Sequence, residues 1–532
     1  MNNDHSVAAQ RTFLGHPVGL FVLFFTEMWE RFSFYGMKAL LIFYLVKYHL
    51  FADEAGNLIL GSYAALVYAL PVVGGYLADK YLGFRKAIIF GAVLLVLGHV
   101  GMAYEGNAAT MSADGSVDRD EFAMQVFFFS LSLIILGVGF LKANISSIVG
   151  ELYTKGDARR DSGFTIFYMG INLGSLFATI ICVWLGETYG WGYGFGAAGV
   201  GMVAGLITFL AGRKYLLGKG EPPHPEALKK KVFAGLSQEV LIYTLSVLSL
   251  LVIWQMVQRH SVVEVLLMGA GAIALAYIAF QAFFKSTKVE RDRLIALTIL
   301  IIFSVVFWAL FEQAYSSINL FTDRILDRHV GSTEIAAGQF LSLNALFIFL
   351  LAPVFAWVWV KLSKKKLNPN AAVKFGLAIL MVGFGFGALV LGDSFAGSGK
   401  IAMIWLVVMY LLHTVGELFL SPVGLSYVTK LSPMRMVGFM MGVWFLATAG
   451  SEYIAVLLAN IASVDVVAGE TASFVEQKAG YISLYQSLFY IGMIIGLFLL
   501  LISPLIKRMM HGVDEEKEDT VEGEFPNTDN AE

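Results

Sequence analysis

The chain has 532 residues, of which 58% are hydrophobic and only 14% are charged, and its net charge is −3. Because soluble globular proteins carry about 25% charged residues, this composition excludes that class and indicates a helical membrane protein with many spans. There is no basic excess for nucleic acid, and the single cysteine, Cys182, excludes an internal disulfide. No cysteine or histidine cluster has ligand spacing, so we expect neither a metal nor a cofactor.

Fourteen apolar segments are predicted to cross the bilayer, and several exceed the ~20 residues that a crossing needs. In chain order they are 18–50, 59–79, 84–104, 121–151, 162–187, 191–215, 236–257, 262–284, 294–322, 334–361, 372–393, 401–429, 437–461 and 480–506. Alternate loops are rich in Lys and Arg, which places those loops in the cytoplasm. An even number of spans then places both termini there.

The first span carries a cluster of charged residues. At ~100° per residue, Glu27, Arg31, Tyr35 and Lys38 share one helix face, and Glu30 lies beside it. A single charge at the centre of a span costs about 2.5–3.5 kcal/mol, so such a cluster indicates a functional site. Since two carboxylates share one guanidinium, we expect one of them to exchange a proton. The alternative is an ion pair that only holds the helix.

The turn after the second span and the overall spacing of spans indicate a transporter. Residues 75–86, GYLADKYLGFRK, resemble the cytoplasmic loop motif of the major facilitator superfamily. The hairpin 236–284 has no ionisable residue deep in its apolar centres, which predicts that it is a peripheral insertion. Without it, six spans, a basic linker and six spans remain, which is the layout of carriers with a cavity between two halves.

We therefore predict an all-α membrane protein with the major-facilitator fold, made of two six-helix bundles and an inserted two-helix hairpin. The predicted divisions are a bundle at 1–217, the linker and hairpin at 218–292, a second bundle at 293–511 and an acidic, disordered tail at 512–532.

Further charged residues lie deep in later spans. Lys142 lies in the fourth span, where the alternative to a functional role is a side chain that reaches to the membrane surface. Glu312 and Glu417 lie in spans of the second half. Glu452 is also flanked by apolar residues, but it is nearer a span end, and its role stays open between a structural pair and a functional one.

The two halves carry opposite charges, with Arg31, Lys38 and Lys142 in the first and Glu312 and Glu417 in the second. A cavity between them would suit a small zwitterion with a carboxylate at one end and an ammonium at the other. Groups expected to contact the rest of such a molecule are Tyr35, Tyr68, Asn172 and Asn344 for backbone amides and Trp308 and Trp444 for side chains.

Three motifs resemble those of the proton-dependent oligopeptide transporters. Residues 27–36, EMWERFSFYG, resemble the family's first-helix motif ExxERFxYYG. Residues 167–175, FYMGINLGS, are similar to its fifth-helix signature, and residues 417–424, ELFLSPVG, to the motif of its tenth core helix. The resemblance covers nearly the whole chain and includes the extra hairpin of bacterial members. It implies proton-driven import of di- and tripeptides across a bacterial plasma membrane, without enzymatic activity.

The resemblance also implies roles for individual residues. Arg31 and Lys142 would hold the peptide carboxylate, Glu417 the peptide ammonium, and Glu27 and Glu30 would couple protons to Arg31. Glu312 would be a proton-linked partner, while Tyr35, Tyr68, Asn172, Asn344, Trp308 and Trp444 would line the substrate. Two departures concern substrate range: Phe34 stands where the motif has a Tyr, and Lys38 stands where some members carry Arg.

Other readings remain open. A proton-coupled carrier of another small solute, such as nitrate or a peptide-like metabolite, would use the same scaffold, although Glu417 argues against a plain anion. A membrane enzyme would need a nucleophile–base pair or a metal site, and His413 has no second His or Cys near it. A channel would need no proton-coupling cluster. Expected partners are therefore peptides, protons and lipid, with no obligatory protein partner.

Overall fold

The computed structural model describes residues 11–154, 157, 159–233, 235–365, 367–462 and 473–513, except for the side chains of Pro422 and Leu425. The acidic tail predicted at 512–532 lies outside the described residues from 514 onward. Thirteen helical segments of the described chain are long and apolar enough to cross a membrane. The fourteenth predicted span is α1 (Val18–Phe43), which carries the charged cluster in its centre.

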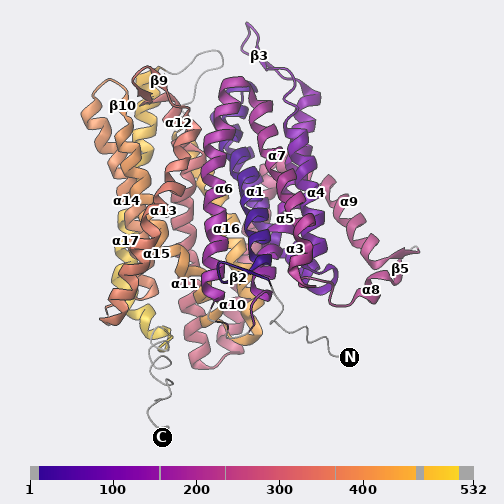
Figure 1. The fold of residues 1–532 in the computed structure, drawn as a ribbon. Coiled ribbons are helices and arrows are strands. Elements are labelled where there is room, and N and C mark those ends of the chain that lie inside the picture. The colour runs from indigo at the N-terminus through magenta and orange to yellow at the C-terminus, as the bar shows by residue number, and fades with distance from the viewer. Residues whose placement is uncertain are drawn as a thin grey trace.

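Two sets of helices make up most of the molecule, and a third group connects them (Figure 1). The N-terminal set is α1, α2 (Asp53–Ala69), α3 (Pro71–Leu77), α4 (Phe84–Met102), α5 (Glu121–Glu151), α6 (Arg160–Tyr189) and α7 (Trp191–Gly212). The connecting group is α8 (Pro225–Lys229), α9 (Gln238–Gln258) and α10 (His260–Phe284). The C-terminal set is α11 (Lys288–Phe311), α12 (Ser317–Arg324), α13 (Ser342–Lys364), α14 (Ala371–Ala396), α15 (Met403–Leu431), α16 (Val437–Ala459) and α17 (Phe474–Met509).

Short strands and turns occupy the loops. The antiparallel pairs are β1 (Thr12–Phe13) with β2 (His16–Pro17), β3 (Thr110–Met111) with β4 (Val117–Asp118), β5 (Lys231–Phe233) with β6 (Leu236–Ser237), and β8 (His329–Val330) with β9 (Thr333–Glu334). The one parallel pair in the described chain is β7 (Leu326–Asp327) with β10 (Ile401–Ala402). Helices dominate because a backbone in lipid must satisfy its own hydrogen bonds.

Each set packs around its own long helices. Helix α1 packs against α6 and α7, and α4 packs against α5; in the other set, α14 packs against α15 and α17. Both ends of the described chain lie at the same end of the bundle (Figure 1), as an even number of spans requires. The major-facilitator arrangement predicted from the sequence is confirmed, while the division points at 217 and 292 remain predictions.

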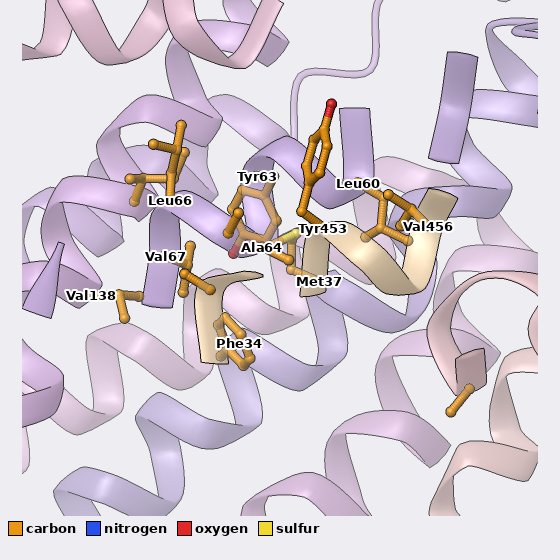
Figure 2. Close-up of a cluster of buried hydrophobic side chains, with 14 of the residues drawn as sticks. Phe34, Met37, Leu60, Tyr63, Ala64, Leu66, Val67, Val138, Tyr453 and Val456 are labelled. Carbon is orange, nitrogen blue, oxygen red and sulfur yellow. The ribbon is translucent and has the colours of Figure 1, made fainter. Parts of the chain in front are cut away.

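The two sets meet closely along α2 and α16. A Cβ atom added at Gly61 of α2 would lie 2.2 Å from Cγ2 of Val456, so only glycine fits there. Leu60 and Tyr63 lie beside Tyr453 and Val456 in a buried apolar cluster that also includes Phe34 of α1 (Figure 2). Helices α6 and α13 form a second junction between the sets.

The hairpin of α9 and α10 lies on the outside of the bundle. Helix α9 packs on α5, and α10 packs on α16, α11 and α2, while only four residues of each helix are buried. This placement agrees with a peripheral insertion that faces lipid.

The turn after span two is fixed by the chain that follows α7. Gly83 has a φ of 75°, and a Cβ atom there would lie 2.4 Å from the Pro222 backbone nitrogen. The Arg85 backbone N–H donates to the Gly220 carbonyl at 2.9 Å, and its guanidinium pairs with Glu221. The glycine of the loop motif is therefore required by both conformation and close packing.

Candidate functional site

The centre of α1 holds the predicted acid–base cluster. The Arg31 guanidinium pairs with both carboxylate oxygens of Glu30, with Nη2 2.6 Å from Oε1, and its Nε lies 3.3 Å from Glu27 Oε1. All three side chains are buried. The other Glu27 oxygen, Oε2, is buried and has no hydrogen-bond partner among the described residues. Glu30 thus forms a forked pair with Arg31, and Glu27 is held more loosely.

Lys38 forms a second cluster, which joins the two sets of helices. Its Nζ lies 3.0 Å from Glu312 Oε2 and 3.0 Å from Glu452 Oε1. The sequence placed Lys38 and Glu312 in opposite halves, and the structure brings them together. The second partner of Lys38 is the carboxylate of Glu452, the residue whose role the sequence left open. Sequence reasoning could have weighed Glu452 more heavily as an unpaired acid in an apolar helix.

Glu312 lies where the seventh core span is interrupted. Helix α11 ends at Phe311, a 3-10 turn covers Glu312–Tyr315, and α12 begins at Ser317. Buried Gln313 stabilises this break, because its Nε2 donates to the Ala455 carbonyl of α16 at 2.6 Å and its Oε1 accepts from Ser317 Oγ at 2.6 Å. The span predicted over 294–322 lies within the helical segment Lys288–Arg324, and the turn inside that segment was not predicted.

A cavity of about 250 Å³ lies between the sets. Its lining comes from both of them: Tyr68, Lys142, Trp308, Glu312, Leu420, Ser421, Trp444, Phe445, Thr448, Ser451 and Glu452. Five predicted site residues are therefore brought together: Tyr68, Lys142, Trp308, Glu312 and Trp444. The Lys142 ammonium lies 3.7 Å from the centre of the Tyr68 ring, which offers it a cation–π contact.

Glu417 and Asn344 form a polar pair in the C-terminal set. Asn344 Nδ2 donates to Glu417 Oε2 at 2.9 Å and lies 3.1 Å from Thr414 Oγ1. This bond links α13 to α15 and holds the carboxylate of Glu417, which is buried rather than facing lipid. Neither residue is among those that line the cavity.

Three further predicted residues lie outside the cavity lining. The Tyr35 ring stacks on Tyr315 at 6.5 Å and lies 5.9 Å from the Arg31 guanidinium carbon, so it connects the two charged clusters. Asn172 donates to the Tyr168 carbonyl within its own helix at 3.1 Å. Arg31 itself is engaged by its two glutamates.

Lys38 of the N-terminal set faces two carboxylates of the C-terminal set, whereas Arg31 is paired with Glu27 and Glu30 of its own helix. The arrangement can hold a doubly charged molecule and can store protons on carboxylates that compete for one cation. Among the described residues, no group of three or more His, Cys, Asp or Glu side chains is arranged to hold a metal ion.

Further bonds join the two sets beyond the C-terminal end of α1, in the turn that follows it and at the start of α2. Lys47 pairs with Asp323 at 2.7 Å, and the Arg324 guanidinium pairs with Asp53 at 2.5 and 2.8 Å. Asn57 Nδ2 donates to Asn460 Oδ1 at 2.9 Å. These contacts add to the junction between the two sets at that end of the molecule.

Comparisons with known proteins agree with this architecture. Residues 85–474 match the sequence profile of the POT family. The chain is 38% identical to an uncharacterized transporter, YclF, of Bacillus subtilis, over 95% of this chain and 97% of that one. It is 36% identical to a di-/tripeptide transporter of Lactococcus lactis, over 95% and 98% of the two chains. Among solved structures, a variant of a peptide transporter POT in complex with alafosfalin is similar, with a TM-score of 0.80, 35% identity and coverage of 96% and 100%.

Proposed function

The chain belongs to the POT family, and from this premise we propose that it is a proton-coupled symporter that imports di- and tripeptides. The observation that supports this most directly is a cavity between the two sets, whose lining includes Lys142 from the N-terminal set and the carboxylates of Glu312 and Glu452 from the C-terminal set. A peptide is a zwitterion whose two ends match these charges. The relative from Lactococcus lactis is named for di- and tripeptides.

The proposed substrate contacts follow the charges. Arg31 and Lys142 hold the peptide carboxylate, and Glu417 holds the ammonium while Asn344 orients it. Trp308 and Trp444 lie on the cavity wall and offer flat apolar surfaces that accept side chains of different shapes. Tyr35, Tyr68 and Asn172 serve the backbone amides, for which Asn172 must exchange its bond within α6.

Proton coupling is assigned to the α1 cluster. Of its two acids, Glu27 is the better proton acceptor, since one of its oxygens is buried without a partner. A buried charge that lacks hydrogen bonds is costly, whereas a protonated carboxyl group is less so. Protonation of Glu27 leaves the guanidinium of Arg31 more available to the peptide carboxylate, and loss of the proton weakens that contact.

Transport proceeds by alternating access, in which the two sets rock about the central site. We infer a bacterial plasma membrane location with both termini in the cytoplasm, on the basis of the loop charges. The proton gradient supplies the energy, so the proposal requires no cofactor, no enzymatic step and no protein partner.

The test is uptake of labelled dialanine into proteoliposomes with an imposed inward proton gradient. Accumulation above equilibrium is expected, and an uncoupler should abolish it. Unlabelled dipeptides should compete, whereas nitrate should not. Uptake that competes with nitrate but not with dipeptides would favour the carrier of another solute.

The same assay tests the coupling role. Glu27→Gln keeps the shape of a protonated Glu27 and removes its charge. Counterflow of dialanine should remain within about threefold of wild type, and accumulation should fall at least about tenfold for a gradient of one pH unit, which is the contribution of one proton. Unchanged accumulation by this variant would contradict the assignment of Glu27.

A further inference from the structure

Lys38 is a buried cation that both sets of helices share. Its Nζ lies 3.0 Å from Glu312 Oε2 and 3.0 and 3.1 Å from the two carboxylate oxygens of Glu452. Lys38 as a whole residue is only 1% exposed, and Glu452 is 4% exposed. The ring of Tyr315 covers the ammonium at 4.4 Å. One cation therefore serves two carboxylates, one at the end of α11 and the other on α16.

This group has the same composition as the α1 cluster, namely two carboxylates and one cation. In each cluster the cation can neutralise one carboxylate, and the other carboxylate needs a proton or a second cation to be neutralised. The buried centre as a whole has two more carboxyl groups than cations; the carboxyl groups are Glu27, Glu30, Glu312, Glu417 and Glu452, and the cations are Arg31, Lys38 and Lys142. A zwitterionic peptide does not change this balance, whereas protons do.

The surroundings of Glu452 contain few other charges. The charged and titratable groups that lie near the Lys38 cluster are Tyr35 of α1, Tyr63 and Tyr68 of α2, Lys142 of α5, Glu417 of α15 and Tyr315 of the turn after α11. Tyr453 follows Glu452 on α16, and its hydroxyl donates to the His260 carbonyl and to Glu264 Oε2 of α10. Glu452 also lines the cavity, so a proton on it has a route to that space.

If the two sets of helices separate at the C-terminal end of α1, Lys38 must move away from both carboxylates, because Lys38 belongs to one set and both acids belong to the other. Separating the groups while all are charged would leave three unpaired charges in a buried place, which is strongly unfavourable. Protons on the carboxylates remove most of that cost. A cluster of this kind therefore links the opening step to proton uptake.

We propose that Glu452 is a second proton-coupling carboxylate of the carrier, in addition to the acids of the α1 cluster. A proton from water binds a Glu452 carboxylate oxygen when the two sets separate at this end. It is released to the cavity when Lys38 returns to Glu452, and no other bond is made or broken. The inference rests on the proposed peptide transport and adds one coupled proton to it.

The test compares Glu452→Gln, Glu452→Asp and Glu264→Gln with wild type in proteoliposomes. Protons and labelled dialanine are counted together, from the internal pH and the radiolabel, and counterflow is measured separately. In Glu452→Gln, the ratio of protons to peptide should fall by one, and accumulation should fall about tenfold for a gradient of one pH unit. Counterflow should remain, Glu452→Asp should keep the wild-type ratio, and Glu264→Gln, which removes an acid near α16 outside the cluster, should match wild type.

Three outcomes would overturn the inference. The first is an unchanged proton ratio in Glu452→Gln. The second is loss of counterflow and accumulation together in Glu452→Gln and Glu452→Asp alike, which indicates a purely structural pair. The third is a lowered ratio in Glu452→Asp equal to that in Glu452→Gln, since the carboxylate would then be irrelevant. Failure of the wild-type protein to take up dialanine would instead refute the proposed function.

Discussion

Buried carboxylates in this protein differ in the partners that hold them. Glu30 forms a forked pair with Arg31, Glu417 accepts one amide bond from Asn344, and Glu27 leaves an oxygen unpaired. A carboxylate with one neutral donor and no cation is well suited to receive an ammonium group, because it is oriented but not neutralised. Glu417 is in this state, which supports its role with the amino terminus of the peptide.

Glu417→Gln should therefore weaken binding of peptides that carry a free ammonium. Loss of a charge-assisted hydrogen bond costs about 1.5–3 kcal/mol, so the half-saturating concentration of dialanine should rise about 10- to 100-fold. The matched control is propionyl-alanine, which lacks the ammonium and should compete equally well against the variant and wild type. A similar shift for both compounds, measured by competition with labelled dialanine, would contradict the assignment.

Several candidate site residues could be picked out from the sequence because an ionised group in an apolar span has few explanations. This reasoning found Arg31, Lys38, Lys142 and Glu312. Pairing could not be read in the same way, since Lys38 and Glu452 are 414 positions apart. Which acid lies opposite which base depends on how the helices rotate and pack in three dimensions.

At the scale of helices, α2 and α16 form the closest junction between the two sets. The Gly61 backbone lies against Val456, one turn beyond Glu452 on α16. The fit at Gly61 thus limits how closely α2 and α16 can approach each other near Lys38.

The predicted spans agreed with the helices within several residues. The break after Phe311 was missed, since the segment EQAYSS contains neither Gly nor Pro.

Gly61→Ala should keep α2 and α16 apart. An added methyl group at an overpacked site costs about 1–3 kcal/mol, so dialanine uptake should slow about fivefold or more, as measured by initial rates. Val456→Ala removes the two methyl groups that the added methyl group would contact. The double variant Gly61→Ala with Val456→Ala should therefore recover much of the uptake rate. Gly269 of α10 has open space around it, so Gly269→Ala is the matched control and should transport normally.

For the whole molecule, composition and loop charge were enough to predict the architecture. Apolar length determined the number of spans, and the six-plus-six spacing indicated the major-facilitator fold. The hairpin could be recognised because it lacks buried charge, and it does lie at the periphery. The position of the cavity required coordinates, because its lining comes from five separate helices and the turn at Glu312.

The predicted orientation can be tested by cysteine labelling in whole cells. Cys182 is 0% exposed and should not react, so single new cysteines report alone. Lys400→Cys, in the exposed loop before β10, should react with an impermeant maleimide added outside the cells. Lys229→Cys, exposed at the end of α8, should react only after permeabilisation. The reverse pattern would invert the assigned topology.

Gln313 gives the Lys38 cluster one more property. By bonding the Ala455 carbonyl, it fastens the turn that carries Glu312 to the helix that carries Glu452. We therefore expect the two carboxylates to move together, so that Lys38 separates from Glu312 and Glu452 in the same step. A carrier with only one of these acids protonated should therefore stay closed at this end, which would limit the passage of protons without peptide.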